Sequence, residues 1–281
     1  MNAPRPIWLV NNPLSGSNGD ATLGALESCC GEHGFRVAHR TAFPAQDLPS
    51  PAMLDAGGIE CVAVFAGDGT INSLLEALGG WGGTVLVLPG GTMNLLYHRL
   101  HGDRTLEQVV EAAANGAAVR RRPGVIRCSF GTAYAGMLAG PGTSWGKVRE
   151  AMREARVVEL AAEAVEAARE TLAGDMIACR EPTLGRPEGY PLISLTPQDA
   201  GMEVEAYHAE SAGEYAVQAL ALLRRNFREG PHDDLGLTRS LRLASTEGKP
   251  FGLLVDGELV EAAPEVEFTL AACEVDLLAT V

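Results

Sequence analysis

Between residues 5 and 115, short and almost wholly apolar runs alternate with longer segments whose apolar residues recur at helical spacing. The apolar runs are typical of strands buried on both faces of a sheet, and the longer segments predict helices between them. Strands are expected at Pro6–Val10, Phe35–Arg40, Cys61–Phe65 and Thr84–Leu88. Helices are expected at Asp20–His33, weakly within residues 44–58, from about Thr70 to Gly79, up to Leu100, and at Leu106–Ala114. This alternation predicts a parallel sheet with helices on both of its faces.

The pattern changes near Ala118, after which most apolar runs are short and strand-like. A basic segment, Arg120–Pro123, marks a linker or the entry to a strand. Two helices are expected beyond it, a long one over residues 147–173 and one at Tyr215–Arg225 that opens with a capping box of Ser211 and Glu214. Strands are expected within Val125–Leu138 and at Met176–Cys179, Leu192–Thr196, Met202–His208, Leu241–Ala244, Phe251–Val255, Glu265–Leu270 and Glu274–Leu278. The sequence therefore predicts an α/β domain at 1–118 and an antiparallel, β-rich domain at 119–281.

The stretch from Ala66 to Asn72 joins the central strand to its helix through a glycine turn. A strand, a glycine turn and a helix start direct backbone N–H groups and a positive helix end toward one point, which suits an anion. Gly67 and Gly69 are expected to allow positive φ and a close approach of a ligand. Asp68 stands at this point, and a carboxylate beside a phosphate makes sense where a divalent metal lies between them. An ordinary strand-to-helix turn capped by Asp68 is the alternative.

The turn matches neither of two common nucleotide-binding motifs. No Gly-Lys-Ser/Thr follows it, as a Walker A loop requires, and Asn72 occupies the third glycine position of a Rossmann fingerprint. Two more polar turns, Asn11–Gly19 and Pro89–Asn94, follow other expected strands. Because ligands of parallel sheets bind beyond the carboxyl ends of the strands, we expect the three turns to gather there.

The composition narrows the choice of partners and compartment. A net charge of −14 argues against nonspecific nucleic-acid binding, so no nucleic-acid partner is expected. The six cysteines are scattered without a CxxC pair, which is typical of reduced residues in a cytoplasmic protein. No run approaches the ~20 apolar residues of a membrane span, so any membrane contact is expected to be peripheral, at the inner face of the membrane.

Four segments, in their order along the chain, resemble the catalytic family of diacylglycerol kinases, which includes soluble bacterial lipid kinases and sphingosine kinases. The matching segments are Asn12-Pro13 with Ser15-Gly16, Ala66–Asn72, Leu88–Asn94 and Asp256-Gly257-Glu258. They span nearly the whole chain, and the ordered set is more specific than any one segment. The resemblance implies an N-terminal α/β nucleotide domain, similar to NAD kinases and phosphofructokinases, and a C-terminal antiparallel β-sandwich domain, with the site in the cleft between them.

The same resemblance implies the site residues. The positions that match the family's ATP-binding residues are Asn12, Thr41, Ala66, Gly67, Asp68, Gly69, Thr70, Asn72 and Thr92. Asp68 would hold Mg²⁺, and Glu258 matches the proton acceptor for the lipid hydroxyl. A plain hairpin at Asp256-Gly257 is the alternative interpretation of that segment.

The chain departs from the family pattern in two places. Ala66 stands where the family usually has glycine, and Leu95 stands where it usually has aspartate. The second change removes a carboxylate from the expected metal arrangement. The family's structural magnesium loop is matched only loosely by Asp199–Gly201, and that metal site is not carried over.

Other candidate residues have simpler interpretations. His98 and His101 could bind a metal with Asp103, but their spacing favours a pair flanking a helix end. A row of arginines in the long helix is interpreted as a solvated face rather than as contacts to lipid headgroups. These arginines are Arg149, Arg153 and Arg156.

We therefore predict an ATP- and Mg²⁺-dependent kinase that phosphorylates a hydroxyl of a diacylglycerol-like or long-chain-base lipid. A soluble-substrate kinase of the NAD kinase type is one alternative. A nucleotide- or lipid-binding relative without catalysis is another, and Ala66 and Leu95 keep it open. The expected partners are ATP, the lipid and a membrane surface, and the sequence leaves a homodimer open.

Overall fold

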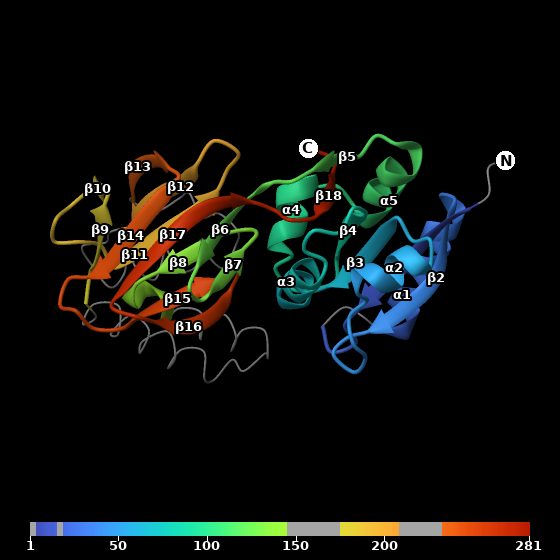
Figure 1. Ribbon diagram of the computed structural model, residues 1–281, viewed down its shortest axis with the longest axis horizontal. Helices are drawn as coiled ribbons and strands as arrows, with labels where there is room; N and C mark the ends of the chain where they lie inside the picture. Colours follow the sequence, from blue (N-terminus) through green and yellow to red (C-terminus); the bar gives the residue numbers. More distant parts are fainter. Residues whose placement is uncertain (1–3, 16–18, 145–174, 208–231) are drawn as a thin grey trace. The chain divides into compact units, whose positions relative to one another are not determined.

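The computed structural model describes residues 4–15, 19–144, 175–207 and 232–281, and the chain forms two compact units (Figure 1). The first unit consists of Met1–Pro123 with Ala272–Val281, and the second of Gly124–Ala271. Several predicted features lie outside the described residues. They are the helices at 147–173 and Tyr215–Arg225, the arginines Arg149, Arg153 and Arg156, and the capping pair of Ser211 and Glu214.

The first unit is built on one six-stranded sheet with the order β2-β1-β3-β4-β18-β5. Its strands are β1 (Arg5–Asn11), β2 (Phe35–Ala42), β3 (Cys61–Ala66), β4 (Thr84–Pro89), β5 (Val119–Arg121) and β18 (Asp276–Ala279). Its helices are α1 (Asp20–Glu32), α2 (Pro51–Ala56), α3 (Asp68–Ala77), α4 (Leu95–His101) and α5 (Leu106–Asn115). The pairs β1–β2, β1–β3 and β3–β4 are parallel, which confirms the predicted parallel sheet.

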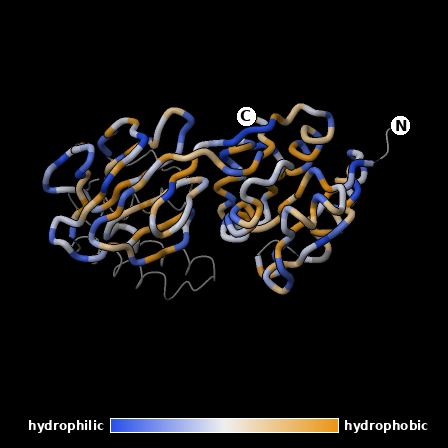
Figure 2. Tube along the Cα trace, viewed as in Figure 1, coloured by the Kyte–Doolittle hydropathy of each residue, from blue (hydrophilic) through white to orange (hydrophobic). Residues whose placement is uncertain are grey.

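Burial explains why the central strands carry almost no polar residues. In β3 every residue after Cys61 is buried, and in β4 every residue before Pro89 is buried. Helix α3 buries Ile71, Leu74 and Leu75. Figure 2 shows the resulting concentration of apolar residues along the strands. Fully burying each such leucine or isoleucine contributes about 1.5–3 kcal/mol relative to an exposed position.

The last strand lies in the first sheet. The run predicted at Glu274–Leu278 was assigned to the β-rich half, but β18 pairs in parallel with β4 and antiparallel with β5. Asp276, at the start of β18, accepts a hydrogen bond from Arg122 Nε at 2.7 Å. Long-range strand pairing of this kind leaves no local signal in sequence, because the same apolar run fits either sheet.

The second unit contains two six-stranded sheets, β10-β9-β14-β17-β6-β7 and β13-β12-β11-β8-β15-β16. The first sheet consists of β6 (Gly124–Cys128), β7 (Gly131–Ala133), β9 (Ile177–Glu181), β10 (Thr183–Leu184), β14 (Ser240–Ser245) and β17 (Glu265–Ala272). The second consists of β8 (Met137–Ala139), β11 (Leu192–Pro197), β12 (Met202–Tyr207), β13 (His232–Thr238), β15 (Phe251–Val255) and β16 (Glu258–Ala262). Residues from both sheets share one apolar core. The predicted fold class, an α/β unit with an antiparallel β unit, is therefore confirmed.

Three strands of the second unit were not predicted: β10, β13 and β16. Burial explains the omission for two of them, because β13 contains no buried residue and β16 contains one, Ala262. Both lie at the edges of their sheet. The expected loop at Asp199–Gly201 is the turn between β11 and β12, where the Gln198 N–H donates to the Gly201 carbonyl.

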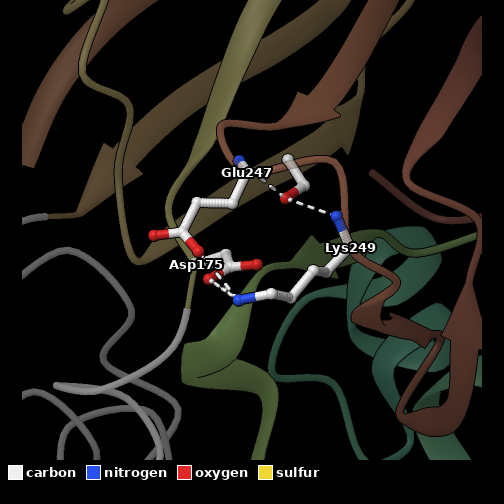
Figure 3. Close-up of polar contacts among 4 residues, drawn as sticks. Asp175, Glu247 and Lys249 are labelled. Atoms are coloured by element: carbon white, nitrogen blue, oxygen red, sulfur yellow. Dashed lines mark hydrogen bonds and ion pairs between the residues drawn. The ribbon is translucent and has the colours of Figure 1, made fainter.

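A network of polar contacts fixes the turn between β14 and β15 (Figure 3). The Ser245 hydroxyl accepts hydrogen bonds from the Glu247 and Lys249 backbone N–H groups. The Lys249 ammonium lies 2.8 Å from the Glu247 carboxylate and 3.3 Å from that of Asp175. These two carboxylates raise the pKa of Lys249, and the hydrogen bond to Glu247 has the larger effect. Because the lysine is exposed, the ion pairs order the turn but add little stability.

His101 makes stability depend on pH. Its side chain is fully buried in α4, and its Nδ1 lies 3.1 Å from Thr280 Oγ1. Burial lowers the pKa of this imidazole to about 4. In the unfolded chain the same imidazole has a pKa of about 6.5. Between pH 6.5 and pH 4 the unfolded chain therefore binds more protons than the folded protein, so the free energy of unfolding falls as the pH falls. From this group we expect a loss of about 2 kcal/mol in the free energy of unfolding between pH 7 and pH 5.

The variant His101→Phe tests this expectation, because phenylalanine fills a similar volume without titrating. Urea denaturation of both proteins at pH 7 and pH 5 gives the difference that belongs to His101. The wild type should lose more stability on acidification than the variant. An equal loss in both would show that His101 does not carry the effect.

Candidate active site

The three polar turns meet at the carboxyl ends of β1, β3 and β4, which are neighbours in the sheet. Asn12, after β1, donates from Nδ2 to Thr70 Oγ1 in the first turn of α3 at 3.0 Å. The third turn touches the second through backbone atoms, since the Gly90 N–H donates to the Ala66 carbonyl at 3.2 Å. The expected gathering of the turns around Asn12, Asp68 and Thr92 is thus what the structure shows within this unit.

Helix α3 begins two residues earlier than predicted, at Asp68, with Gly67 as its N-cap. Because Gly67 has no side chain, the N-cap residue itself makes no capping hydrogen bond. The N–H groups of Gly69 and Thr70 lie in the first turn, where no carbonyl of the helix can accept from them. Together with the helix dipole they form an anion-binding position that also favours the adjacent carboxylate.

The N-cap position of α3 belongs to Gly67, whereas the alternative interpretation gave it to Asp68. The Asp68 carboxylate oxygen Oδ1 accepts a hydrogen bond from the Leu96 N–H, 3.3 Å away, at the start of α4. The side chain is half-buried. Asp68 therefore links the helix that follows β3 to the helix that follows β4.

The glycines of the turns act through close packing, and the expected positive φ at Gly67 and Gly69 was wrong. Gly67 has a φ of −79° and Gly69 lies in the helix. A Cβ on Gly90 would lie 2.5 Å from the Ala66 nitrogen, and one on Gly91 would lie 2.5 Å from the Gly67 Cα. The third turn can approach the second this closely only because Gly90 and Gly91 have no side chains.

Replacing Gly91 by alanine tests this packing. The added methyl group meets backbone atoms, which cannot move aside as a flexible side chain would. We expect a loss of about 1–3 kcal/mol in stability. The control is Gly24→Ala, because a Cβ on Gly24, in the exposed part of α1, meets nothing within 4 Å. Equal melting temperatures for Gly91→Ala and the wild type would contradict the account.

Asn94 is a positioning residue that the sequence analysis did not include in the site. It is the N-cap of α4 and has left-handed backbone angles, with φ 50° and ψ 46°. Its side-chain oxygen accepts from the Gly91 N–H at 2.8 Å, and its Nδ2 donates to the Gly91 carbonyl at 2.9 Å. The amide thus braces the third turn from inside. Asparagine tolerates left-handed backbone angles better than most residues. Its position after the glycine pair could therefore have indicated from sequence that Asn94 belongs to the site.

The other predicted nucleotide residues differ in what they offer a ligand. Thr41 is buried in β2, and its hydroxyl oxygen accepts from Trp8 Nε1 at 2.9 Å, which leaves the hydroxyl hydrogen to donate elsewhere. Ala66 is fully buried with no positive φ, so its methyl group fits the strand and only its backbone could serve. Asn72 is half-buried in α3, and Thr92 is exposed.

The segment Asp256-Gly257-Glu258 forms the hairpin between β15 and β16. Positive φ values at Asp256 (46°) and Gly257 (93°) are those of a two-residue type I′ turn. The buried Asp256 carboxylate accepts from three backbone N–H groups, those of Tyr134, Ala135 and Gly136, at 2.7–2.8 Å. Glu258 is exposed and opens β16. The turn therefore presents the Glu258 carboxylate while Asp256 anchors it.

Neither histidine of α4 gathers metal ligands. His98 Nδ1 lies 3.1 Å from the Gly102 carbonyl, and His101 contacts Thr280, so both flank the helix end as predicted. Among the described residues, no three His, Cys, Asp or Glu side chains group together as they would around a metal ion. The cysteines are free, and Cys30, Cys179 and Cys273 are buried.

Comparisons with known proteins agree with this arrangement. A model of the diacylglycerol kinase catalytic domain matches residues 6–124, which contain all three turns. No curated protein gives a significant match. A crystal structure of a diacylglycerol kinase from Bacillus anthracis str. Sterne is similar over 99% of this chain and 98% of that chain, with a TM-score of 0.61 and 12% sequence identity. A second structure from that organism, assigned to the same enzyme class, gives a TM-score of 0.59 at 12% identity over the same shares. At this identity, the two structures establish the fold.

Proposed function

We propose that the chain is an ATP-dependent kinase that phosphorylates a hydroxyl of a diacylglycerol-like or long-chain-base lipid. The match of residues 6–124 to the diacylglycerol kinase catalytic domain supports this proposal. The observation that carries the proposal is the meeting of three polar turns at the start of α3. Phosphoryl transfer needs positioning and charge neutralisation rather than covalent chemistry from the protein, and this arrangement supplies the positioning.

The nucleotide phosphates would be held mainly by backbone groups. The first-turn N–H groups of Gly69 and Thr70 suit the phosphate oxygens, and the Thr41 hydroxyl retains a hydrogen to donate. The N–H groups of Gly90 and Gly91 already donate within the turns, so they brace the site and do not bind the ligand.

A single carboxylate at the start of α3 suits Mg²⁺, although it cannot supply all the ligands of a metal ion. Mg²⁺ commonly takes one or two carboxylates from the protein and its other ligands from phosphates and water. Asp68 is the carboxylate in place, half-buried at the helix start. When bound, Mg²⁺ would neutralise part of the phosphate charge. The chain's own contribution is to fix the Asp68 side chain through the Leu96 N–H.

Glu258 is proposed to accept the proton of the attacking lipid hydroxyl. A general base must be reachable by substrate and fixed in position. Glu258 meets the first condition by its exposure, and the anchored turn at Asp256 meets the second.

An ATP assay over several acceptors tests the proposal. Radiolabelled ATP and Mg²⁺ would be offered with diacylglycerol, a long-chain base or NAD, and the products separated by thin-layer chromatography. The proposal expects label in a lipid. Label in NAD alone would identify a soluble-substrate kinase, and no label with retained ATP binding would identify a non-catalytic relative.

Leu95 gives a prediction about metal affinity. It is the first residue of α4, half-buried, next to the Leu96 N–H that binds Asp68. Leu95→Asp adds a carboxylate near the phosphates, so we expect half-maximal activity at a lower Mg²⁺ concentration. Leu95→Asn is the matched control, since it has the same shape without the charge. An unchanged or higher requirement in Leu95→Asp would place the side chain toward the core, where a buried charge also lowers stability.

A further inference from the structure

The edge strand β5 carries a run of consecutive arginines. Arg120 and Arg121 lie in the strand, Arg122 follows it, and all three are exposed. The strand pairs with β18 on one side and is the last in the sheet order, so within the described part of the chain its other side has no strand neighbour. The arginines therefore lie along an open margin of the first unit.

This margin is positive in a strongly acidic protein. The chain carries a net charge of −14, and the first unit contains eight arginines and no lysine against thirteen Asp and Glu residues. Three of those eight arginines are consecutive at β5. One carboxylate, Asp276, pairs with two of them, at 2.7 Å from Arg122 and 3.9 Å from Arg120. Asp276 therefore forms the ion pairs of this margin among the described residues, and Glu274, two residues before it, is the other acid of that segment and is exposed. Three arginines against these two acids leave a local positive excess.

Arg121 makes no ion pair among the described residues. Successive side chains of a strand point to opposite faces, so Arg121 projects away from the face that Asp276 shares with Arg120 and Arg122. Next to it, Val119 is 48% exposed. Charges on an edge strand can also serve to prevent pairing with the edge of another sheet. A single charge is enough for that purpose, and an exposed valine favours such pairing, so protection alone does not explain three arginines beside Val119. Cationic side chains beside an exposed apolar residue suit a surface with negative headgroups above an apolar interior.

We infer that the β5 edge, defined by Val119 and Arg120–Arg122, is the surface with which the protein docks on an anionic membrane. The inference rests on the proposed function, because a lipid kinase must visit a bilayer, and it names the face that does so. The pairing register supports it. Arg121 lies opposite Leu277, which pairs with Val85 near the start of β4, whereas the polar turns follow the other end of β4. Docking at β5 leaves those turns open to nucleotide.

Vesicle binding by the full chain tests the inference. The protein would be sedimented with vesicles of phosphatidylcholine alone or of phosphatidylcholine with phosphatidylglycerol, at low and high salt. The variants are Arg121→Gln and Arg121→Glu. The matched control is Arg36→Gln, because Arg36 is exposed on β2, the opposite edge strand of the same sheet. Circular dichroism checks that each variant is folded.

An arginine near an anionic membrane strengthens binding roughly fivefold. We expect the wild type to bind only the anionic vesicles and to be released by salt. Arg121→Gln should bind roughly fivefold more weakly and Arg121→Glu roughly 25-fold more weakly, with little change for Arg36→Gln. Equal weakening by Arg36→Gln, or wild-type binding by Arg121→Glu, would overturn the inference. So would a wild type that binds neither vesicle, which would leave an acidic protein as the partner of this edge.

A kinase assay on a short-chain, water-soluble lipid separates this inference from the proposed function. Arg121→Gln should phosphorylate it at the wild-type rate, since no bilayer is involved. If the wild type phosphorylates no lipid but shows the expected vesicle pattern, the docking surface stands and the proposed kinase function fails. A rate loss in Arg121→Gln on the soluble lipid would count against a docking role.

Discussion

Glu258→Gln should lower the turnover number roughly 10²–10⁴-fold, the usual contribution of general acid–base help. The amide keeps the size of the side chain but cannot take the proton from a lipid hydroxyl. ATP binding should change little, because the turns proposed to hold the nucleotide belong to the other unit. Steady-state kinetics and a nucleotide titration of the same protein give both quantities.

Asp256→Asn is the matched comparison, two residues away in the same hairpin. Its carboxylate accepts three backbone hydrogen bonds while buried, and an asparagine amide has only one oxygen to accept them. We expect the melting temperature to fall by more than it does in Glu258→Gln, and the rate to fall by less. If Asp256→Asn abolishes turnover and Glu258→Gln does not, the roles are reversed. If neither affects the rate, the base lies elsewhere.

Asp68→Asn should remove most turnover and leave the fold intact. The amide oxygen can still accept the Leu96 N–H, so the link between α3 and α4 survives. The change removes the negative charge expected to hold Mg²⁺ beside the phosphates. A kinase assay over a range of Mg²⁺ concentrations measures the effect, and circular dichroism checks the fold.

Asp103→Asn is the control for this change, because Asp103 is an exposed acid just beyond α4. It removes the same charge from the same unit without touching the turns. Near-wild-type activity in a folded Asp68→Asn protein would refute the assigned role. A comparable loss in Asp103→Asn would point to net charge rather than to a site.

Local patterns predicted the centre of the first unit well because its central strands are almost wholly apolar. The runs that became β3 and β4 could hardly be anything but buried strands, and each ends in a turn with its own polar signature. The meeting of those turns then follows from the parallel sheet. The hairpin at Asp256 could also be predicted from sequence, since Asp-Gly is a favoured pair in the two-residue turn that these residues form.

What the sequence could not supply was contact between distant segments. Nothing near Asp68 indicates that its carboxylate meets Leu96, and nothing near Gly91 indicates the approach to Gly67. The predicted positive φ at Gly67 also failed, because the sequence does not show whether a glycine is needed for its backbone angles or for the close approach of another segment, here Gly91. Edge strands such as β13 and β16 were missed because few of their residues are buried, so their sequences show no regular alternation of apolar and polar residues.

The position of β18 has a consequence for the order in which the protein can assemble. This strand lies between β4 and β5, yet its residues are synthesised after the whole second unit. Until they emerge from the ribosome, β4 has an open edge and β5 has no partner in the sheet. We expect the second unit to fold first as a complete body and the first unit to close around the last strand. A fragment that ends at Pro123 should therefore misfold or aggregate, even though it contains every one of the polar turns.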